Sequence, residues 1–153
     1  MEFRNLMEVM AEYGKAMETK YKEELENSGR KASGRLISSI NSNVTVDGMT
    51  YAIDFSLEDY WKYVENGTKP HFPPVSKILE WVKIKPILPT PDSSGKVPTP
   101  EQLAFLISRK ISIYGTDGTK DLEDTLELTD MEWRDRIASA LDRDVTESIS
   151  LLF

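Results

Sequence analysis

Cysteine is absent from this chain of 153 residues, and histidine occurs only once, at position 71. The lack of cysteine excludes disulfides, thiolate metal sites and cysteine nucleophiles. No apolar run approaches the roughly eighteen residues that a membrane span needs. The N-terminal segment MEFRNLMEVM also lacks the continuous apolar core of a signal peptide. We therefore expect a protein that is made in the cytosol and does not associate with a membrane.

Recognisable catalytic motifs are missing as well. His71 cannot supply a second imidazole ligand to a metal, and no nucleophile can be placed beside it and Glu65. The segment Ser94–Val97 lacks the first glycine and the hydroxyl residue of a phosphate-binding loop. The segment Asp117–Asp121 has its glycine in the wrong place for a calcium loop, and no ligating glutamate follows at the required spacing. These observations predict a protein that is not an enzyme and binds no cofactor, metal or small-molecule substrate.

Positive charge is scarce near the C-terminus. The chain has 26 acidic and 19 basic residues, for a formal net charge of −7. Residues 1–115 carry 15 of each sign, whereas residues 116–153 carry 11 acidic and 4 basic residues. Such a surface disfavours nucleic acid, because binding to phosphates depends on positive charge. It is typical instead of a face that keeps a protein in solution or meets a basic partner.

The patterns that are present predict a small α+β protein with long amphipathic helices at both ends. Its length suits a single domain spanning residues 1–153, with its core within about residues 1–128. Apolar residues at helical spacing predict a long helix over about residues 2–27 and a short one over residues 33–40. The pair Asp47-Gly48 between two β-prone runs predicts an antiparallel hairpin. Two strands alone are barely stable, so this hairpin needs helices behind it or another chain beside it.

A helix–elbow–helix unit is predicted over residues 60–86. Apolar residues before Gly67 share one face of a short helix, and Gly67 is a helix stop. Pro70 forces the residue before it out of the helical conformation, so the chain continues in an extended form. Pro74 can begin the second helix of the unit. A rigid unit of this kind usually presents a surface.

A loop and a capping box follow this unit. Residues 87–98 are rich in proline, serine and glycine, which predicts a mobile loop between two helices. Thr99 and Gln102 then fit a capping box, with proline at the first helical position. The next helix therefore begins at about residue 100.

An acidic C-terminal helix is predicted over about residues 130–152, after a separate short helix over residues 122–128. Thr129 and Glu132 fit a capping box at its start. Because this helix lies outside the predicted core, we expect a chain without residues 129–153 to fold but not to assemble. Three residues of its apolar stripe are candidates for contact with a partner: Trp133, Ile137 and Leu141.

Three short segments occur in an informative order. GRLISSI at residues 34–40 precedes the predicted hairpin, and YVENGTKP at residues 63–70 follows it. LAFLISRKI at residues 103–111 then runs into YGT at residues 114–116. In these segments the chain resembles the small tail-completion or head–tail joining proteins of tailed bacteriophages, over about residues 30–120. The proline-rich loop and the acidic C-terminal helix depart from the compact members of that family.

The resemblance implies a non-enzymatic structural protein of the virion neck, assembled in the cytoplasm of the host bacterium. It implies a ring of six or twelve identical subunits that contacts the portal and other neck or tail proteins. DNA would pass through the ring, with only non-specific contact. A second interpretation stays open, in which the chain is an acidic interaction module or inhibitor that binds a basic protein.

On the first interpretation the elbow sets the shape of the joint between subunits. Its candidate contact residues are Tyr63, Glu65, Gly67, Thr68, Pro70 and His71. For Glu65 two roles are open, a local cap on backbone N–H groups or a salt bridge across the joint. We expect His71 to be a half-exposed elbow residue that hydrogen-bonds to backbone.

Overall fold

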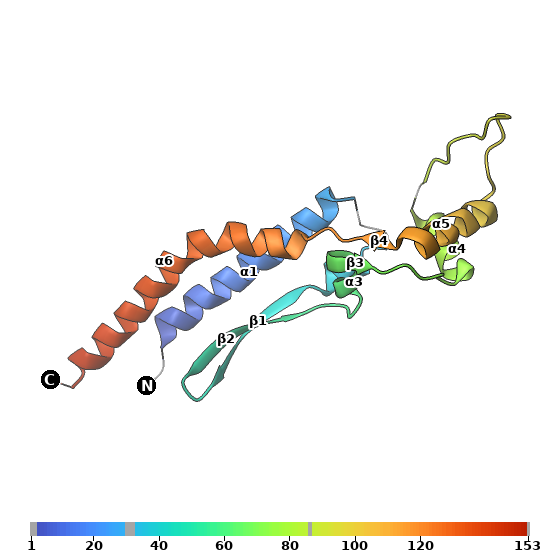
Figure 1. The fold of residues 1–153 in the computed structure, drawn as a ribbon. Coiled ribbons are helices and arrows are strands. Elements are labelled where there is room, and N and C mark those ends of the chain that lie inside the picture. Colours follow the sequence, from blue (N-terminus) through green and yellow to red (C-terminus); the bar gives the residue numbers. More distant parts are fainter. Residues whose placement is uncertain (1–2, 30–32, 86, 153) are drawn as a thin grey trace.

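The computed structural model describes residues 3–29, 33–85 and 87–152, which form a long body with an arm at one end (Figure 1). The body contains α1 (Arg4–Asn27), α2 (Arg35–Ser39), β1 (Asn41–Asp47), β2 (Thr50–Ser56), α3 (Trp61–Asn66) and α6 (Asp121–Ser150). The arm contains α4 (Val75–Ile84) and α5 (Pro100–Tyr114). Two very short strands, β3 (Gly67–Thr68) and β4 (Thr116–Asp117), join the body to the arm. The predicted α+β class is confirmed.

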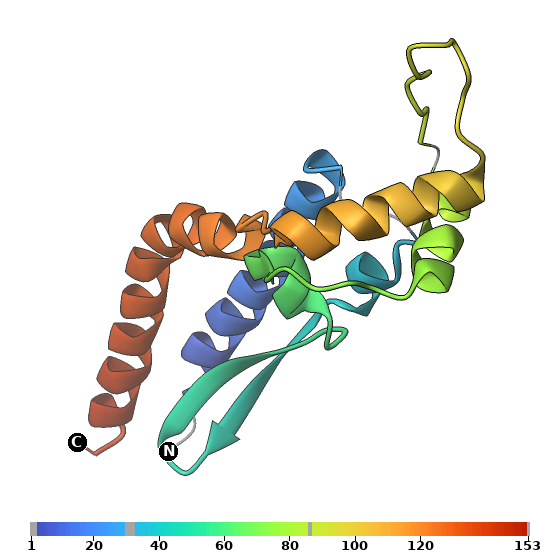
Figure 2. The same ribbon diagram turned by 45° about the vertical axis from the view of Figure 1, so that its right-hand side comes forward.

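Helix α1 is the centre of the body. Helix α6 packs along one side of it and the β1–β2 hairpin along another (Figures 1 and 2). The two long helices run antiparallel, because Asn5 at the start of α1 bonds to Asp144 near the end of α6. Tyr13 and Trp133 stack midway along the pair, with 5.5 Å between ring centroids. The predicted long helices at both ends of the chain therefore lie side by side.

The core is a strip along α1, where apolar residues recur every three or four positions. One cluster of buried residues joins α1 to the α2 region: Tyr21, Leu25, Leu36 and Ile40. A second cluster lies between α1 and α6: Val9, Trp133 and Ala140. Within the described hairpin strands only Ser42 is buried, so the sheet adds little to the core. Much of the body's apolar surface is therefore half-open.

The predicted hairpin is confirmed, with pairing that runs from Asn41–Ser56 to Asp47–Thr50. Its two-residue loop is Gly48-Met49 rather than Asp47-Gly48. Gly48 has φ +60° at the first loop position, where type II′ turns require glycine. The hairpin approaches α1 closely, because a Cβ on Gly14 would lie 2.7 Å from the Ser42 hydroxyl.

Helix α6 is continuous from Asp121 to Ser150, so the prediction of two helices divided at Thr129 is wrong. The Thr129 hydroxyl donates to the Thr125 carbonyl one turn earlier, at 2.7 Å, and lies 2.8 Å from the Met17 sulfur. A threonine bonded in this way stays inside a helix instead of capping one. Because the second half of α6 packs on α1, we expect a chain without residues 129–153 to lose the packing of the body.

The helix–elbow–helix prediction is confirmed by α3, the extended chain after it, and α4, which follows Pro74. The predicted end signal at Pro86 lies outside the described residues. The capping box of α5 is also confirmed, with the Gln102 amide 3.3 Å from the Thr99 hydroxyl and a return bond of 3.0 Å. Residues 87–98 form a loop without helix or strand that extends from the arm. In the described ranges every helix is too short or too polar to span a lipid bilayer.

Candidate functional site

The joint between body and arm is built from two Gly-Thr pairs, which we call the crossing (residues 67–68 and 115–117). Helices α3 and α5 both end at a glycine, and the residues that follow pair as β3 and β4. The two threonine hydroxyls, of Thr68 and Thr116, lie 2.9 Å apart. Gly67 (φ 71°, ψ −167°) and Gly115 (φ 71°, ψ −154°) have nearly the same backbone conformation. This conformation is essentially restricted to glycine.

The two backbones touch at the crossing. A Cβ on Gly67 would overlap the carbonyl oxygen of Thr116, and a Cβ on Gly115 would overlap that of Thr68. Gly118 is equally close to the carbonyl of Glu65. The direction in which the arm leaves the body is therefore set by backbone contacts that side chains would prevent.

Glu65 is the buried polar residue of this joint, with 6% of its surface exposed. Its carboxylate accepts hydrogen bonds from the amides of Leu122 and Glu123, both at 3.0 Å. These amides belong to the first turn of α6, whose own N-cap residue, Lys120, makes no side-chain cap. A carboxylate at a helix N-terminus satisfies free N–H groups and complements the helix dipole. Of the two roles open for Glu65, the structure has the backbone cap.

Replacing Glu65 with alanine should lower the free energy of unfolding by about 2 kcal/mol, because two N–H groups of α6 lose their acceptor. Glutamine keeps one oxygen at the same place and should lose about half as much. Chemical denaturation measures both changes. The control is Glu80→Ala, which removes an exposed carboxylate from a surface ion pair. An equally small loss in Glu65→Ala and Glu80→Ala would contradict the capping role.

Asp144 caps the start of α1 in the same way. Its carboxylate accepts from the amides of Asn5 (3.1 Å) and Leu6 (2.8 Å) and from the side-chain amide of Asn5 (2.8 Å). Burial raises the pKa of Asp144, but these hydrogen bonds outweigh it and hold that pKa below its ordinary value. Each long helix is therefore capped by a carboxylate from a distant part of the chain.

Glu18 fastens the hairpin to α1. Its carboxylate accepts from the amide and the hydroxyl of Ser42, both at 2.6 Å, and from the Lys15 ammonium at 2.7 Å. Burial raises the pKa of Glu18, yet the bonds from Lys15 and Ser42 bring that pKa below its ordinary value. In the sequence Glu18 and Asp144 are indistinguishable from solvated acidic residues on helix faces, so nothing there indicated their roles.

The stability of the protein should fall in acid because of these two carboxylates. A lowered native pKa means that the unfolded chain takes up protons first as the pH falls. The stabilisation is complete above the ordinary values, 3.8 for Asp144 and 4.5 for Glu18. It is lost as the pH falls through the lower native pKa values. Denaturation at a series of pH values between 6 and about 2 would measure this loss.

The Asp144→Asn variant should show a smaller loss of stability with acid than the parent protein. Asp142→Asn is the matched control, since it removes the same charge from an exposed position of α6. An acid dependence in Asp144→Asn as steep as in Asp142→Asn would rule out the contribution of Asp144.

The elbow residues predicted as contacts divide into two groups. Tyr63 (64% exposed), Pro70 and His71 lie on the surface. Gly67 and Thr68 lie within the crossing and set its geometry. His71 bonds to backbone as predicted, with Nδ1 2.9 Å from the Lys69 carbonyl oxygen.

The C-terminal candidates are only partly open to a partner. Trp133 is 7% exposed, lies between Tyr13 and the Arg136 guanidinium (3.9 Å from the ring centroid), and belongs to the core. Its prediction as a partner contact does not fit this burial, because α1 already occupies its face. Ile137 packs against the same cluster, whereas Leu141 is 41% exposed.

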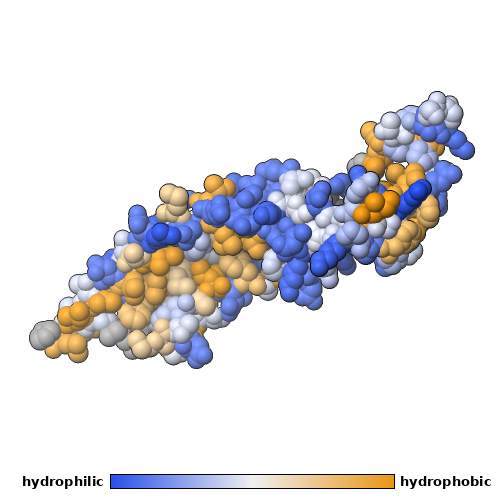
Figure 3. Space-filling view, viewed as in Figure 1, coloured by the Kyte–Doolittle hydropathy of each residue, from blue (hydrophilic) through white to orange (hydrophobic). Residues whose placement is uncertain are grey.

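A half-open apolar trough runs along the body between α6 and the hairpin, with α1 as its floor (Figure 3). Its deepest part is a pocket of about 240 Å³ with a nearly wholly apolar lining. The lining residues are Met17, Tyr21, Ile40, Phe55, Leu57, Trp61, Leu122 and Leu126. Leu126, Leu141, Val145 and Ile149 follow one side of α6, are 40–52% exposed, and continue the trough toward the C-terminus.

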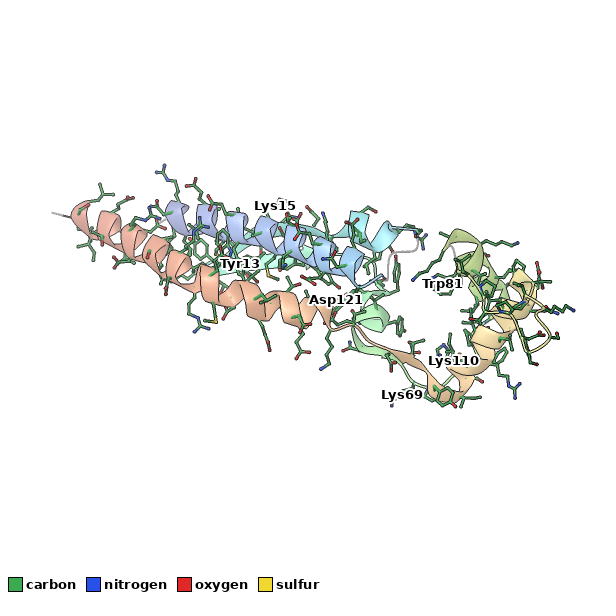
Figure 4. The ribbon with its side chains drawn as sticks, turned by 90° about the horizontal axis from the view of Figure 1, so that it is seen from above. Tyr13, Lys15, Lys69, Trp81, Lys110 and Asp121 are labelled. Carbon is green, nitrogen blue, oxygen red and sulfur yellow. The ribbon has the colours of Figure 1, made fainter. Side chains whose placement is uncertain are left out.

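The arm also has an apolar surface without a cover. Helices α4 and α5 pack mainly on each other, away from the body, as the view with Trp81 and Lys110 labelled shows (Figure 4). Only Ala104 and Ser108 of the arm helices are buried. Six large apolar residues of the arm are at least half exposed: Phe72, Ile84, Phe105, Leu106, Ile113 and Tyr114. Two helices with so small a core are typical of an element completed by a neighbour.

The described residues contain no cluster of three histidine, cysteine or acidic side chains that could hold a metal ion. Comparison of the chain with protein-family models, curated proteins and solved structures finds no match. The sequence pointed to Glu65 and to the glycines of the elbow, but not to the trough. Its walls come from segments some 70 residues apart, which only the tertiary structure brings together.

Proposed function

We propose that the protein is a structural subunit of the virion of a tailed bacteriophage, a head–tail connector or tail-completion protein. Identical copies would form a ring that joins the portal to the tail and extends the channel for DNA. The observation that supports this most directly is the crossing. Its two strands come from two of the three segments that resemble this family, YVENGTKP and YGT, which lie 48 residues apart and pair with each other.

The distribution of apolar surface is in keeping with a subunit that works by assembly. The trough and the arm each leave large apolar side chains half exposed, at opposite sides of a joint that fixes their relative direction. Exposed apolar patches of this extent mark contacts with other proteins. A head-to-tail contact between such surfaces forms a closed ring when its rotation closes.

The charge of α6 suggests which surface faces protein rather than DNA. Asp121–Ser150 contains ten acidic and three basic residues, a net charge of −7. Phosphates would be repelled from this helix, so it is placed away from the channel. The same charge is the feature that favours the alternative function, an acidic module that binds a basic protein outside the virion.

Deletion of the gene from the phage that encodes this chain tests the proposal. We expect lysates with DNA-filled heads and free tails that do not join, because the subunit between them is missing. Electron microscopy of the lysate and complementation with the gene on a plasmid provide the readout and its control. Normal, infectious particles from the deletion phage would rule out the proposed function and favour an accessory interaction module.

A further inference from the structure

We infer that the arm of one copy docks into the trough of the next copy, so that the surface of α5 and the α6 wall of the trough form the subunit joint. This inference rests on the proposed function, which requires identical subunits to join, and it names the surfaces that do so. The occupant of the trough is thus a second copy of this chain.

The two surfaces are opposite in charge. Residues 69–115, which include the arm, contain seven basic and three acidic residues, a net charge of +4. Helix α6 carries a net charge of −7. Charge complementarity of this kind favours one orientation of two partners and disfavours contacts between identical surfaces. It favours a contact of arm with α6 and opposes arm with arm or α6 with α6.

The residue patterns of the two helices also match. On α5 the exposed pair Phe105-Leu106 and the exposed pair Ile113-Tyr114 enclose Arg109-Lys110 one helical turn from each. On α6 the wall of the trough has Leu126 and then Asp130 at the same spacing, with Glu127 beside them. Apolar residues on either side of a basic pair thus meet an apolar wall interrupted by acidic residues.

The arm cannot reach the trough of its own chain. The crossing directs it away from the end of the body, and the arm helices make few contacts with any body element (Figures 1 and 4). The glycine contacts at the crossing leave no room for the arm to fold back without breaking β3–β4. A contact between surfaces at different places on the same molecule is heterologous, which is the kind that builds rings.

The absence of cysteine allows a direct test by cross-linking. One variant carries Ile113→Cys on the arm, the other carries Leu126→Cys in the trough, and the two full-length chains are mixed under mild oxidation. We expect the mixed 113–126 disulfide to form about tenfold faster than a mixed disulfide between Ile113→Cys and the control Asn43→Cys, an exposed site on the polar face of the hairpin.

Charge reversal gives the second readout. Arg109→Glu with Lys110→Glu should slow the 113–126 cross-link about tenfold, and Glu127→Lys with Asp130→Lys in the partner should restore it. Equal rates for the trough and the control site, or a dominant 113–113 product, would overturn the inference. Such a result with the chain present in virions would leave the proposed function standing. The cross-link in a protein absent from virions would support the joint and reject the function.

Discussion

Replacement of Gly67 by alanine should lower the free energy of unfolding by about 3 kcal/mol or more. At φ 71° and ψ −167° a residue with a Cβ is strained by itself. The added carbon would also overlap the Thr116 carbonyl oxygen and lie 2.7 Å from the Gly118 amide nitrogen. These neighbours are backbone atoms, so they can make room only if the crossing opens. Chemical denaturation measures the stability, and amide exchange at residues 115–118 reports on the crossing.

The matched control is Gly95→Ala in the proline-rich loop. Gly95 has φ +79°, but nothing lies within 4 Å of the site of its Cβ. This variant should carry only the cost of the backbone conformation, about 1 kcal/mol. The difference between the two variants measures the close approach at the crossing. Equal losses would show that the two backbones are farther apart than described here.

Replacement of Trp133 by alanine should cost about 3 to 4 kcal/mol, because it empties the main contact between α1 and α6. The indole is 7% exposed and stacks on Tyr13, and the Arg136 guanidinium covers its other side. Arg136 also pairs with Glu12 of α1, so it would lose part of its support. Thermal or chemical unfolding of the purified protein measures the change.

Met131→Ala is the control for this variant, because Met131 lies on the same helix and is 82% exposed. It should change the stability by less than about 0.5 kcal/mol. If Trp133→Ala kept the stability of the parent but lost contact with other virion proteins, Trp133 would be an interaction residue after all. The helix would then be an appendage rather than part of the body.

How much the sequence could predict depends on the range of the contacts involved. The long helices, the hairpin, the elbow and the capping box at Thr99 follow from local patterns, and all appear in the structure. The break predicted at Thr129 was wrong because a threonine beside a later glutamate fits a cap equally well as a helix interior. The decision was made by Met17 and Thr125, against which its hydroxyl packs.

The candidate site shows the same limit. The glycine and prolines of the elbow announce a rigid joint, yet the partner of Gly67-Thr68 is a second Gly-Thr pair 48 residues away. Glu65 was recognised as a possible cap, but its helix begins more than 50 residues later. No local pattern links such residues. The trough depends in the same way on how α6 and the hairpin lie on α1.

The number of copies of this chain in purified virions tests the central proposal most directly. Quantitative mass spectrometry of gradient-purified particles, with the portal protein as internal standard, gives that number. A head–tail connector should be present in every preparation at a fixed ratio to the portal, with the six or twelve copies that the family resemblance implies. Absence from the particles, or an amount that varies between preparations and falls during purification, would contradict a structural role in the virion.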